Sequence, residues 1–182
     1  FCKQQQPQLV LHLGYCGASD PSLQNGDLVL ASEIINANTG EQLLVRQDLQ
    51  ARAEKLCQEW GLRFQKGSLL SVDKIIDEPH QKAFLGTKHQ ALAIDMESFA
   101  LAQACAARKI PYLVLRSVFD PLEMQMPEIA CCLDEAGNIK PFALVCELIR
   151  QPKKIIQLPR LMQYALKARE AISTFAKGWI SL

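Results

Sequence analysis

The stretch Pro111-Tyr112-Leu113-Val114-Leu115-Arg116-Ser117-Val118-Phe119-Asp120-Pro121 carries the most apolar strand pattern of the chain. Its first six residues predict a strongly apolar strand over 111–116. The segment that follows this strand contains an acid, Asp120, where side chains at a sheet edge can meet a ligand. The fold class then depends on whether similar strands recur along the chain and on what separates them.

Similar short apolar runs recur on the amino-terminal side of this stretch. They predict strands over residues 8–13, 27–31, 66–71 and 91–94. Apolar residues at helical spacing predict helices over residues 47–60 and 97–108, and Gly61 ends the first of them. Strands that alternate with helices predict an α/β fold with a mostly parallel sheet flanked by helices.

The carboxy-terminal part differs from this core in pattern and charge. Two helices are predicted over residues 141–150 and 158–179, with a break at Pro152. The second helix has an apolar stripe formed by Leu158, Leu161, Met162, Ala165, Ile172, Phe175 and Trp179. Core packing is the default explanation for such a stripe. Residues 150–182 hold seven basic side chains and one acid. This excess indicates a solvated helix face or, as the sharper alternative, a weak contact with an anionic membrane surface.

Length and composition are ordinary for a soluble globular protein, with 182 residues, 49% hydrophobic and 21% charged. We expect one domain over residues 1–182, with a core at 8–125 and a helical extension at 126–182. The net charge of +1 gives no support to nucleic-acid binding. No apolar run reaches the roughly 18 residues that span a bilayer, and residues 1–6 do not resemble a signal peptide. The missing initiator Met suggests a start inside a longer gene product.

The seven cysteines form no pattern typical of a metal site or a disulfide framework. Their number is odd, no C-x-x-C pair occurs, and no His/Cys cluster has ligand spacing. We therefore expect no bound metal, and small buried thiols in a reducing cytoplasm. The adjacent pair Cys131-Cys132 has no functional explanation in the sequence.

The predicted strands end in segments that are suited to a ligand site. These segments are Gly14-Tyr15-Cys16-Gly17, Ser71-Val72-Asp73, Asp95-Met96-Glu97 and Ser117-Val118-Phe119-Asp120, and three of the four carry acids. In parallel sheets, ligands bind beyond the carboxyl ends of the strands. The sequence therefore predicts an active or binding site at this edge.

Each segment also has a purely structural explanation. The glycine-rich loop at 14–18 can approach an anion or a sugar with its backbone N–H groups, or it is a plain tight turn. Glu97 can accept hydrogen bonds from vicinal hydroxyls, or it only offsets the dipole of a helix N-terminus. Asp120 is expected to be partly desolvated, which raises its pKa and suits it to general-acid work, although a nearby Arg would oppose this shift. Alternatively, Asp120 only closes an Asp-Pro turn.

The order of these motifs resembles one family. Leu-x-Leu-Gly-x-x-Gly-x-x-x-Pro-Ser-Leu-x-x-Gly-Asp-Leu-Val begins at Leu11, Asp-Met-Glu-Ser begins at Asp95, and Ile-Pro-x-x-x-x-Arg-x-x-x-Asp-Pro begins at Ile110. Together they are similar to the nucleoside phosphorylase/nucleosidase superfamily, over roughly residues 8–125. The tail, with Met126-Pro127-Glu128 and Arg150-Gln151-Pro152, is similar to hopanoid-associated adenosylhopane phosphorylases.

The resemblance implies a mixed, mostly parallel sheet and cleavage of the N-glycosidic bond of a purine nucleoside. It implies that Glu97 binds the ribose hydroxyls, with Met96 beside the sugar. It implies that Asp120 faces the purine and supports protonation at N7. Further residues are implied for the base pocket, Ile75, Ile76 and Phe119, and for the side of the anomeric carbon, Gly14, Tyr15, Cys16 and Gly17. No cofactor is implied, with phosphate possible as a co-substrate.

The chain also departs from the family pattern. Tyr15 stands where a small polar residue is usual, Ala18 where another Gly is usual, and Phe119 where many members have Ser. The first part of the family's domain, which normally handles the nucleophile, is missing. The expected protein is therefore either an enzyme or a catalytically degenerate relative that only binds a nucleoside or a protein partner. The missing strands are expected to leave an exposed sheet edge and to favour a homodimer.

Overall fold

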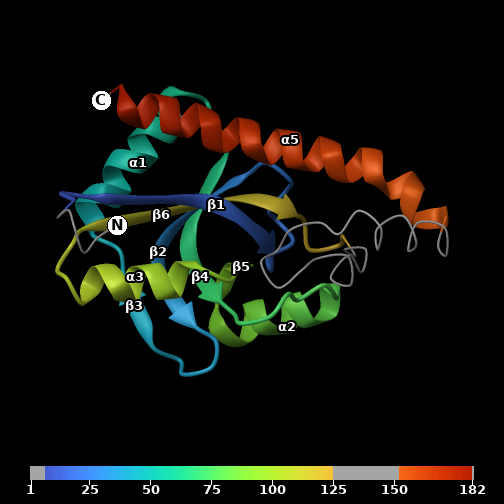
Figure 1. Cartoon of the computed structure of the whole chain (residues 1–182), viewed down its shortest axis with the longest axis horizontal. Helices are drawn as coiled ribbons and strands as arrows, with labels where there is room; N and C mark the ends of the chain where they lie inside the picture. The colour runs from blue at the N-terminus through green and yellow to red at the C-terminus, as the bar shows by residue number, and fades with distance from the viewer. Residues whose placement is uncertain (1–6, 125–151, 182) are drawn as a thin grey trace.

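Strands and helices alternate along the part of the chain that the computed structural model describes, residues 7–124 and 152–181 (Figure 1). The strands are β1 (Val10–Ala18), β2 (Leu28–Asn36), β3 (Gln42–Leu44), β4 (Phe64–Ser71), β5 (Ala91–Asp95) and β6 (Tyr112–Asp120). The helices are α1 (Gln47–Glu59), α2 (Pro79–His89), α3 (Ser98–Ala106) and α5 (Pro152–Ile180). The predicted α/β class is thereby confirmed.

The six strands form one mixed sheet in the order β3-β2-β4-β5-β1-β6. The longer ladders, β1–β6, β2–β4 and β4–β5, are parallel. The antiparallel pairings β1–β5, β2–β3 and β2–β6 are shorter. Because β2 also pairs with β6, the sheet closes on itself and β3 projects from the ring. The mixed, mostly parallel sheet expected from the sequence is confirmed.

Strand β6 is the most buried strand of this ring, with every residue except Phe119 inside the protein. It lies between β1 and β2, and helix α5 packs across it. Figure 1 shows α5 on one side of the sheet and α2 and α3 on the other. An uninterrupted apolar run is the pattern expected of a strand that is covered on both faces.

Helix α5 is anchored by aromatic residues near its carboxyl end. Phe175 and Trp179 are buried in the main core and stack with their ring centroids 5.7 Å apart. The guanidinium of Arg52 on α1 lies 4.6 Å from the Trp179 ring centroid, a cation–π contact that ties α1 to α5.

The predicted boundaries need correction at several places. Residues 14–18 are not a loop, because they continue β1 and pair with β6 and β5, with a bulge between Cys16 and Gly17. No sequence pattern indicated β3 or α2. Helix α5 begins at Pro152 and not at Leu158, and its Met162 is exposed and outside the apolar stripe. The predicted helix 141–150 and the pair Cys131-Cys132 lie outside the described residues.

Strand β1 has an open edge. Its ladder with β5 contains only Gly17 and Ala18, so in the described part of the chain residues 10–15 have a strand partner on the β6 side alone. The side chains from Val10 to Leu13 are only half-buried, unlike those of β6 beside them. This edge fits the expectation of an incompletely covered sheet.

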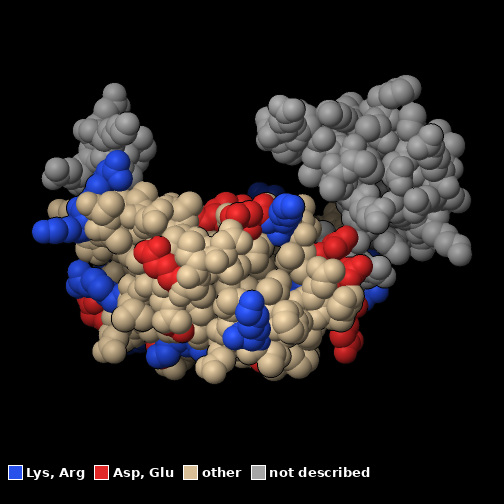
Figure 2. Space-filling view, turned by 90° about the horizontal axis from the view of Figure 1, so that it is seen from below, with Lys and Arg blue, Asp and Glu red and all other residues tan. Residues whose placement is uncertain are grey.

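The surface carries charges of both signs. Figure 2 shows one face of the molecule, on which basic and acidic side chains are interspersed among uncharged ones. Within residues 7–124 and 152–181, no helix has the length and hydropathy to cross a membrane.

The packing of α5 can be tested by truncating the buried side chain of Phe175. We expect Phe175→Ala to lower the free energy of unfolding by about 3–5 kcal/mol, because Phe175 is fully buried and its removal leaves a cavity. Leu166→Ala is the matched control on the same helix, since Leu166 is 57% exposed, and should change stability by less than about 0.5 kcal/mol. Chemical denaturation of both variants measures the difference, and equal effects would show that α5 does not dock as described.

Candidate active site

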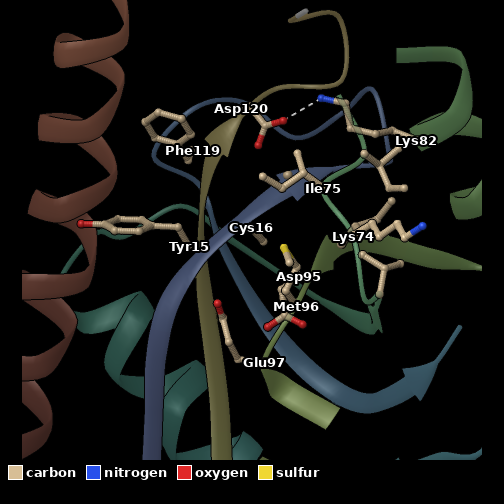
Figure 3. A pocket seen from close by; sticks show the side chains of 14 residues that line it. Tyr15, Cys16, Lys74, Ile75, Lys82, Asp95, Met96, Glu97, Phe119 and Asp120 are labelled. Carbon is tan, nitrogen blue, oxygen red and sulfur yellow. Dashed lines mark hydrogen bonds and ion pairs between the residues drawn. The ribbon is translucent and has the colours of Figure 1, made fainter. Parts of the chain in front are cut away.

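The carboxyl ends of β1, β5 and β6 and the segment after β4 surround a cavity of about 320 Å³ (Figure 3). This volume is within the range of small-molecule pockets. The cavity is lined by nearly all the residues singled out in the sequence: Tyr15, Cys16, Gly17, Ile75, Ile76, Met96, Glu97, Phe119 and Asp120. Glu97, which follows β5, and Asp120, at the end of β6, thus share one cleft. Gly14, the remaining candidate, does not line it.

Gly14 instead provides room for a buried arginine. A Cβ atom at this position would lie 1.7 Å from Nη1 of Arg116, so no other residue fits without displacing the guanidinium. Gly14 and Arg116 are paired in the β1–β6 ladder. The glycine that the sequence suggested for the ligand side therefore has a packing function beneath the site.

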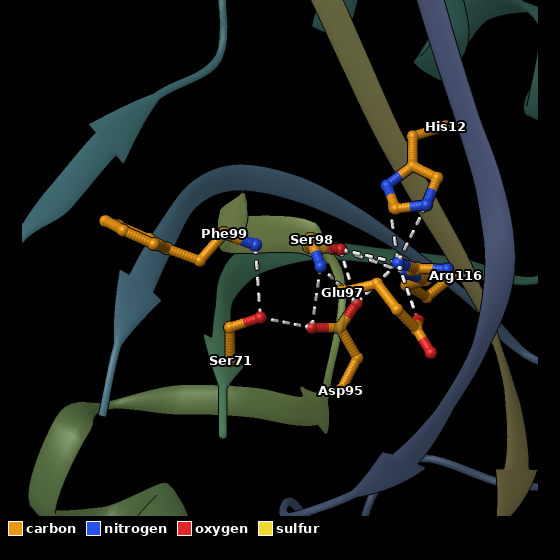
Figure 4. Close-up of polar contacts among 7 residues, drawn as sticks. All are labelled: His12, Ser71, Asp95, Glu97, Ser98, Phe99 and Arg116. Carbon is orange, nitrogen blue, oxygen red and sulfur yellow. Dashed lines mark hydrogen bonds and ion pairs between the residues drawn. The ribbon is translucent and has the colours of Figure 1, made fainter. Parts of the chain in front are cut away.

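Arg116 connects the strand ends through ionic contacts (Figure 4). Its side chain is 2% exposed, and Nη2 lies 2.6 Å from Oδ2 of Asp95 and 3.3 Å from Oε2 of Glu97. The guanidinium also donates to the hydroxyl of Ser98 at 2.9 and 3.0 Å. A buried guanidinium with this many acceptors is held in one orientation.

Asp95, and not Glu97, caps helix α3. Both carboxylate oxygens of Asp95 accept from the backbone N–H of Ser98, at 3.2 and 3.3 Å. The hydroxyls of Ser98 and Ser71 also donate to Asp95. Glu97 occupies the N-cap position but makes no side-chain capping bond. The capping explanation therefore applies to Asp95.

Glu97 keeps its carboxylate available to a ligand. Its side chain is 68% exposed, and its Oε2 lies 3.3 Å from Nη2 of Arg116. Glu97 also lines the cavity. An exposed, oriented carboxylate can accept two hydroxyl hydrogen bonds from a sugar.

His12 lies on the far side of the arginine. Both ring nitrogens are within 3.3 Å of Nη2 of Arg116. Burial, and secondarily the charge of Arg116, lowers the pKa of His12 to about 4. The imidazole is therefore neutral at physiological pH and adds no second positive charge beside the guanidinium.

Asp120 has a different environment from Glu97. Its side chain is 11% exposed, and Oδ2 lies 2.7 Å from Nζ of Lys82 on α2. Burial raises the pKa of Asp120, while the hydrogen bond and the charge of Lys82 act in the opposite direction. The cation that opposes the rise in the pKa of Asp120 is thus Lys82. Arg116, the arginine that the sequence suggested for this effect, faces Asp95 instead.

Apolar side chains form the walls between the two carboxylates. Ile75 and Ile76 come from the segment after β4, and Met96 lies beside Glu97. The rings of Tyr15 and Phe119 approach each other on the β1–β6 side, with centroids 6.3 Å apart. Such walls suit a flat aromatic base or a sugar ring, with polar groups at the two ends.

Some residues of the site could not be selected from the sequence. Lys82 lines the cavity but belongs to α2, which the sequence did not indicate. Asp95 and Ser71 stood in the predicted strand-end segments, yet their spacing did not show that they share hydrogen bonds. The Arg-x-x-x-Asp spacing was visible, but it did not reveal that Arg116 and Asp120 contact different partners.

The cavity has no metal-binding cluster. Among the described residues, no group of three or more His, Cys, Asp or Glu side chains could hold a metal ion. Burial raises the pKa of Cys16 well above its ordinary value, so this thiol is neutral in the pocket wall.

The mouths of closed sheets are among the places where small-molecule pockets occur. The sequence profile of the phosphorylase superfamily matches residues 1–128. The chain therefore belongs to the phosphorylase superfamily, as its motif order led us to expect.

Individual relatives give a consistent comparison. The chain is 28% identical over 130 residues to a 5'-methylthioadenosine/S-adenosylhomocysteine nucleosidase of Staphylococcus carnosus, covering 63% of this chain and 57% of that protein. It is 27% identical over 135 residues to the nucleosidase of the same name from Bacillus cereus, covering 65% and 58%. The chain thus spans less than three fifths of the length of these relatives.

Solved structures show the same fold. The Helicobacter pylori 5'-methylthioadenosine/S-adenosyl homocysteine nucleosidase superposes with a TM-score of 0.69 at 20% identity, over 96% of this chain and 68% of that one. The futalosine hydrolase of the same organism superposes with a TM-score of 0.69 at 19% identity and the same coverage.

The role of Gly14 can be tested by adding one methyl group. We expect Gly14→Ala to lower the free energy of unfolding by at least about 2 kcal/mol, because the added Cβ displaces Arg116 from its buried contacts. Gly40→Ala is the control, since no atom lies within 4 Å of a Cβ there and only its positive φ is strained. The control should cost about 1 kcal/mol. Similar losses in urea denaturation would contradict the packing role of Gly14.

Proposed function

We propose that this chain binds a purine nucleoside in the cavity and takes part in cleaving its N-glycosidic bond. The observation that carries the proposal is the placement of Glu97 and Asp120 in one cavity with apolar walls between them. The nucleosidases among its relatives support the reaction class.

Glu97 is suited to the ribose. Its exposed carboxylate, held by Arg116, offers acceptors for two vicinal hydroxyls. As the bond breaks, the sugar gains oxocarbenium character, and a fixed negative group near the hydroxyls stabilises that positive charge. Met96, beside Glu97, packs against the ring of the sugar in this arrangement.

Asp120 is suited to the base. The departing purine gathers negative charge, which protonation at N7 neutralises. A buried carboxyl group with a raised pKa can support that protonation better than an exposed one. Ile75, Ile76 and Phe119 enclose the planar base.

The nucleophile enters from the side of Tyr15, Cys16 and Gly17 in this proposal. Either water or phosphate attacks the anomeric carbon, and no cofactor takes part. Because the chain spans 57–58% of the length of its curated relatives, residues that activate the nucleophile can lie outside it.

Several finer assignments belong to the same proposal. The open edge of β1 supports self-association as a homodimer, with residues 10–15 as the contact. We also propose action in the cytoplasm, a hopanoid-associated nucleoside as one substrate class, and a weak contact of the basic α5 surface with anionic lipid. Arg160 and Lys167 are among its exposed basic residues.

A second candidate is a protein that binds a nucleoside without cleaving it. The Tyr15–Phe119 ring pair favours this alternative, because two aromatic side chains narrow the side from which the nucleophile would approach. Base binding without base release would identify this case.

The assay for cleavage is release of the free base. The chain is incubated with adenosine, 5'-methylthioadenosine or inosine, with and without phosphate, and the released base is separated by chromatography. Release in the absence of phosphate indicates hydrolysis, and release that requires phosphate indicates phosphorolysis. Absence of both release and nucleoside binding would contradict the proposed function.

The two acids are expected to respond differently to neutralisation. Asp120→Asn should reduce turnover by about 10²–10⁴-fold with little change in nucleoside affinity, since proton donation matters mainly in the transition state. Glu97→Gln should weaken binding and turnover together, because a charged acceptor for two hydroxyls acts before and during cleavage. Turnover, affinity and melting temperature are measured on the same samples. Unchanged turnover in Asp120→Asn at normal stability would remove Asp120 from the mechanism.

A further inference from the structure

Asn25 is a buried residue in the turn that precedes β2, and its side-chain amide joins two elements. The residue is 6% exposed. Its Nδ2 donates to the backbone oxygens of Val118 at 3.1 Å, Phe119 at 3.0 Å and Tyr164 on α5 at 3.0 Å. Only the nitrogen of a side-chain amide donates, so three carbonyl acceptors around it fix the orientation of the group.

The two acceptors on β6 belong to a β-bulge. The register of the β1–β6 ladder skips Phe119, because the residues on either side of it pair with Cys16 and Gly17. In a regular strand successive carbonyls point to opposite neighbours, whereas one nitrogen of Asn25 reaches those of Val118 and Phe119. Bulges beside active sites change the direction of side chains. Asn25 therefore contacts the backbone at the point where β6 changes register.

The register after the bulge places the side chains at the end of β6 within narrow limits. Oδ2 of Asp120 lies 2.7 Å from Nζ of Lys82, and a Cβ atom on Gly17 would lie 2.8 Å from Oδ1. Phe119 lines the same cavity, and its ring centroid lies 6.3 Å from that of Tyr15. A small displacement of this strand end therefore changes the distances at the base end of the cavity.

The turn that carries Asn25 is itself fastened to β6. The backbone N–H of Gly26 donates to the oxygen of Val118 at 2.9 Å, and the N–H of Val118 donates to the oxygen of Asp27 at 2.9 Å. From this fixed point the amide of Asn25 reaches forward to Phe119 and across to α5. Loss of the amide would leave buried carbonyls without this donor, and the strand end would have to move to regain a partner.

We propose that Asn25 is a positioning residue for the base end of the cavity. Its amide holds the bulged end of β6 and thereby sets the places of Phe119 and Asp120. This inference rests on the proposed function, in which those two side chains serve the purine base. Asn25 does not line the cavity, so it acts through the backbone of β6. The alternative is that Asn25 only fastens α5 to the sheet through the oxygen of Tyr164.

The test measures the binding of free adenine and of adenosine to the full chain by calorimetry. Asn25→Ala should bind adenine about tenfold more weakly, the order of effect of one hydrogen bond, because the released strand end encloses the base less well. The ratio of the adenosine and adenine affinities should stay unchanged. This ratio reports the sugar end, where Arg116 and not Asn25 orients Glu97.

Gln50→Ala is the matched control. Gln50 is also 6% exposed, and its Nε2 donates to the backbone oxygens of Val45 at 2.7 Å and Ser32 at 3.5 Å. Neither acceptor belongs to a residue that lines the cavity. Gln50→Ala and Asn25→Ala should both lower the melting temperature, but only Asn25→Ala should weaken adenine binding. An equal loss of adenine affinity in the control would overturn the positioning role.

A second variant at position 25 provides a graded response. Asn25→Ser keeps a shorter hydrogen-bond donor, which can serve one of the carbonyls on β6. It should bind adenine with an affinity between those of the unaltered chain and Asn25→Ala. This variant also keeps the inference testable if Asn25→Ala does not fold, since adenine affinity equal to that of the unaltered chain would then contradict it.

A double-mutant cycle tests whether Asn25 acts through the end of β6. Phe119→Ala removes the ring that Asn25 is proposed to place, so adding Asn25→Ala to this variant should weaken adenine binding little further. If the two losses multiply in the double variant, the residues act independently and the positioning role is wrong.

The outcomes distinguish this inference from the proposed function. Unchanged adenine affinity in Asn25→Ala, at a lowered melting temperature, would show that Asn25 only fastens α5 and would leave the proposed function standing. Failure of the unaltered chain to bind adenine and adenosine would contradict the proposed function and the positioning role with it.

Discussion

The buried ion pair between Arg116 and Asp95 is the interaction on which the site depends. It joins the end of β5 to β6, and the same carboxylate caps α3. Removing either partner would leave an uncompensated charge inside the protein, which typically costs about 3–5 kcal/mol. The pair also requires a glycine at position 14, since the guanidinium occupies the space of a side chain there. This contact thus constrains β1, β5, β6 and the start of α3. The same guanidinium also orients Glu97, through the contact of Nη2 with its Oε2.

The two ends of the cavity differ in solvation. Glu97 is open to solvent and shares its cation with Asp95, whereas Asp120 is buried and paired with Lys82. An exposed carboxylate is suited to accepting hydrogen bonds from hydroxyl groups, whereas burial raises the pKa of Asp120 against the opposing effect of Lys82. Two acids from one sheet edge can therefore serve different parts of one ligand.

The sequence predicted what local patterns encode. The apolar run before Arg116, the alternation of strands and helices, and the acids at strand ends were all visible without the structure. Helix α2 was missed because its sequence, which includes His80, Gln81 and Lys88, has little apolar periodicity. The glycines at 14 and 17 suggested a loop, although Gly14 sits in a strand to admit Arg116. The burial of Lys82 depends on Asp120, which is distant in sequence, so no local signal could indicate it.

Closure of the ring has a consequence for the order in which the protein folds. Strand β6 pairs with β1 and β2, yet it comes last along the chain among the strands that the structure describes. Such long-range pairings are intrinsically slow, because the entropy of loop closure is lost before the contacts form. On the ribosome, β1 to β5 emerge without the strand that joins them. Their apolar faces therefore stay exposed until residues near 120 have left the exit tunnel. During this interval the nascent chain is most prone to aggregation.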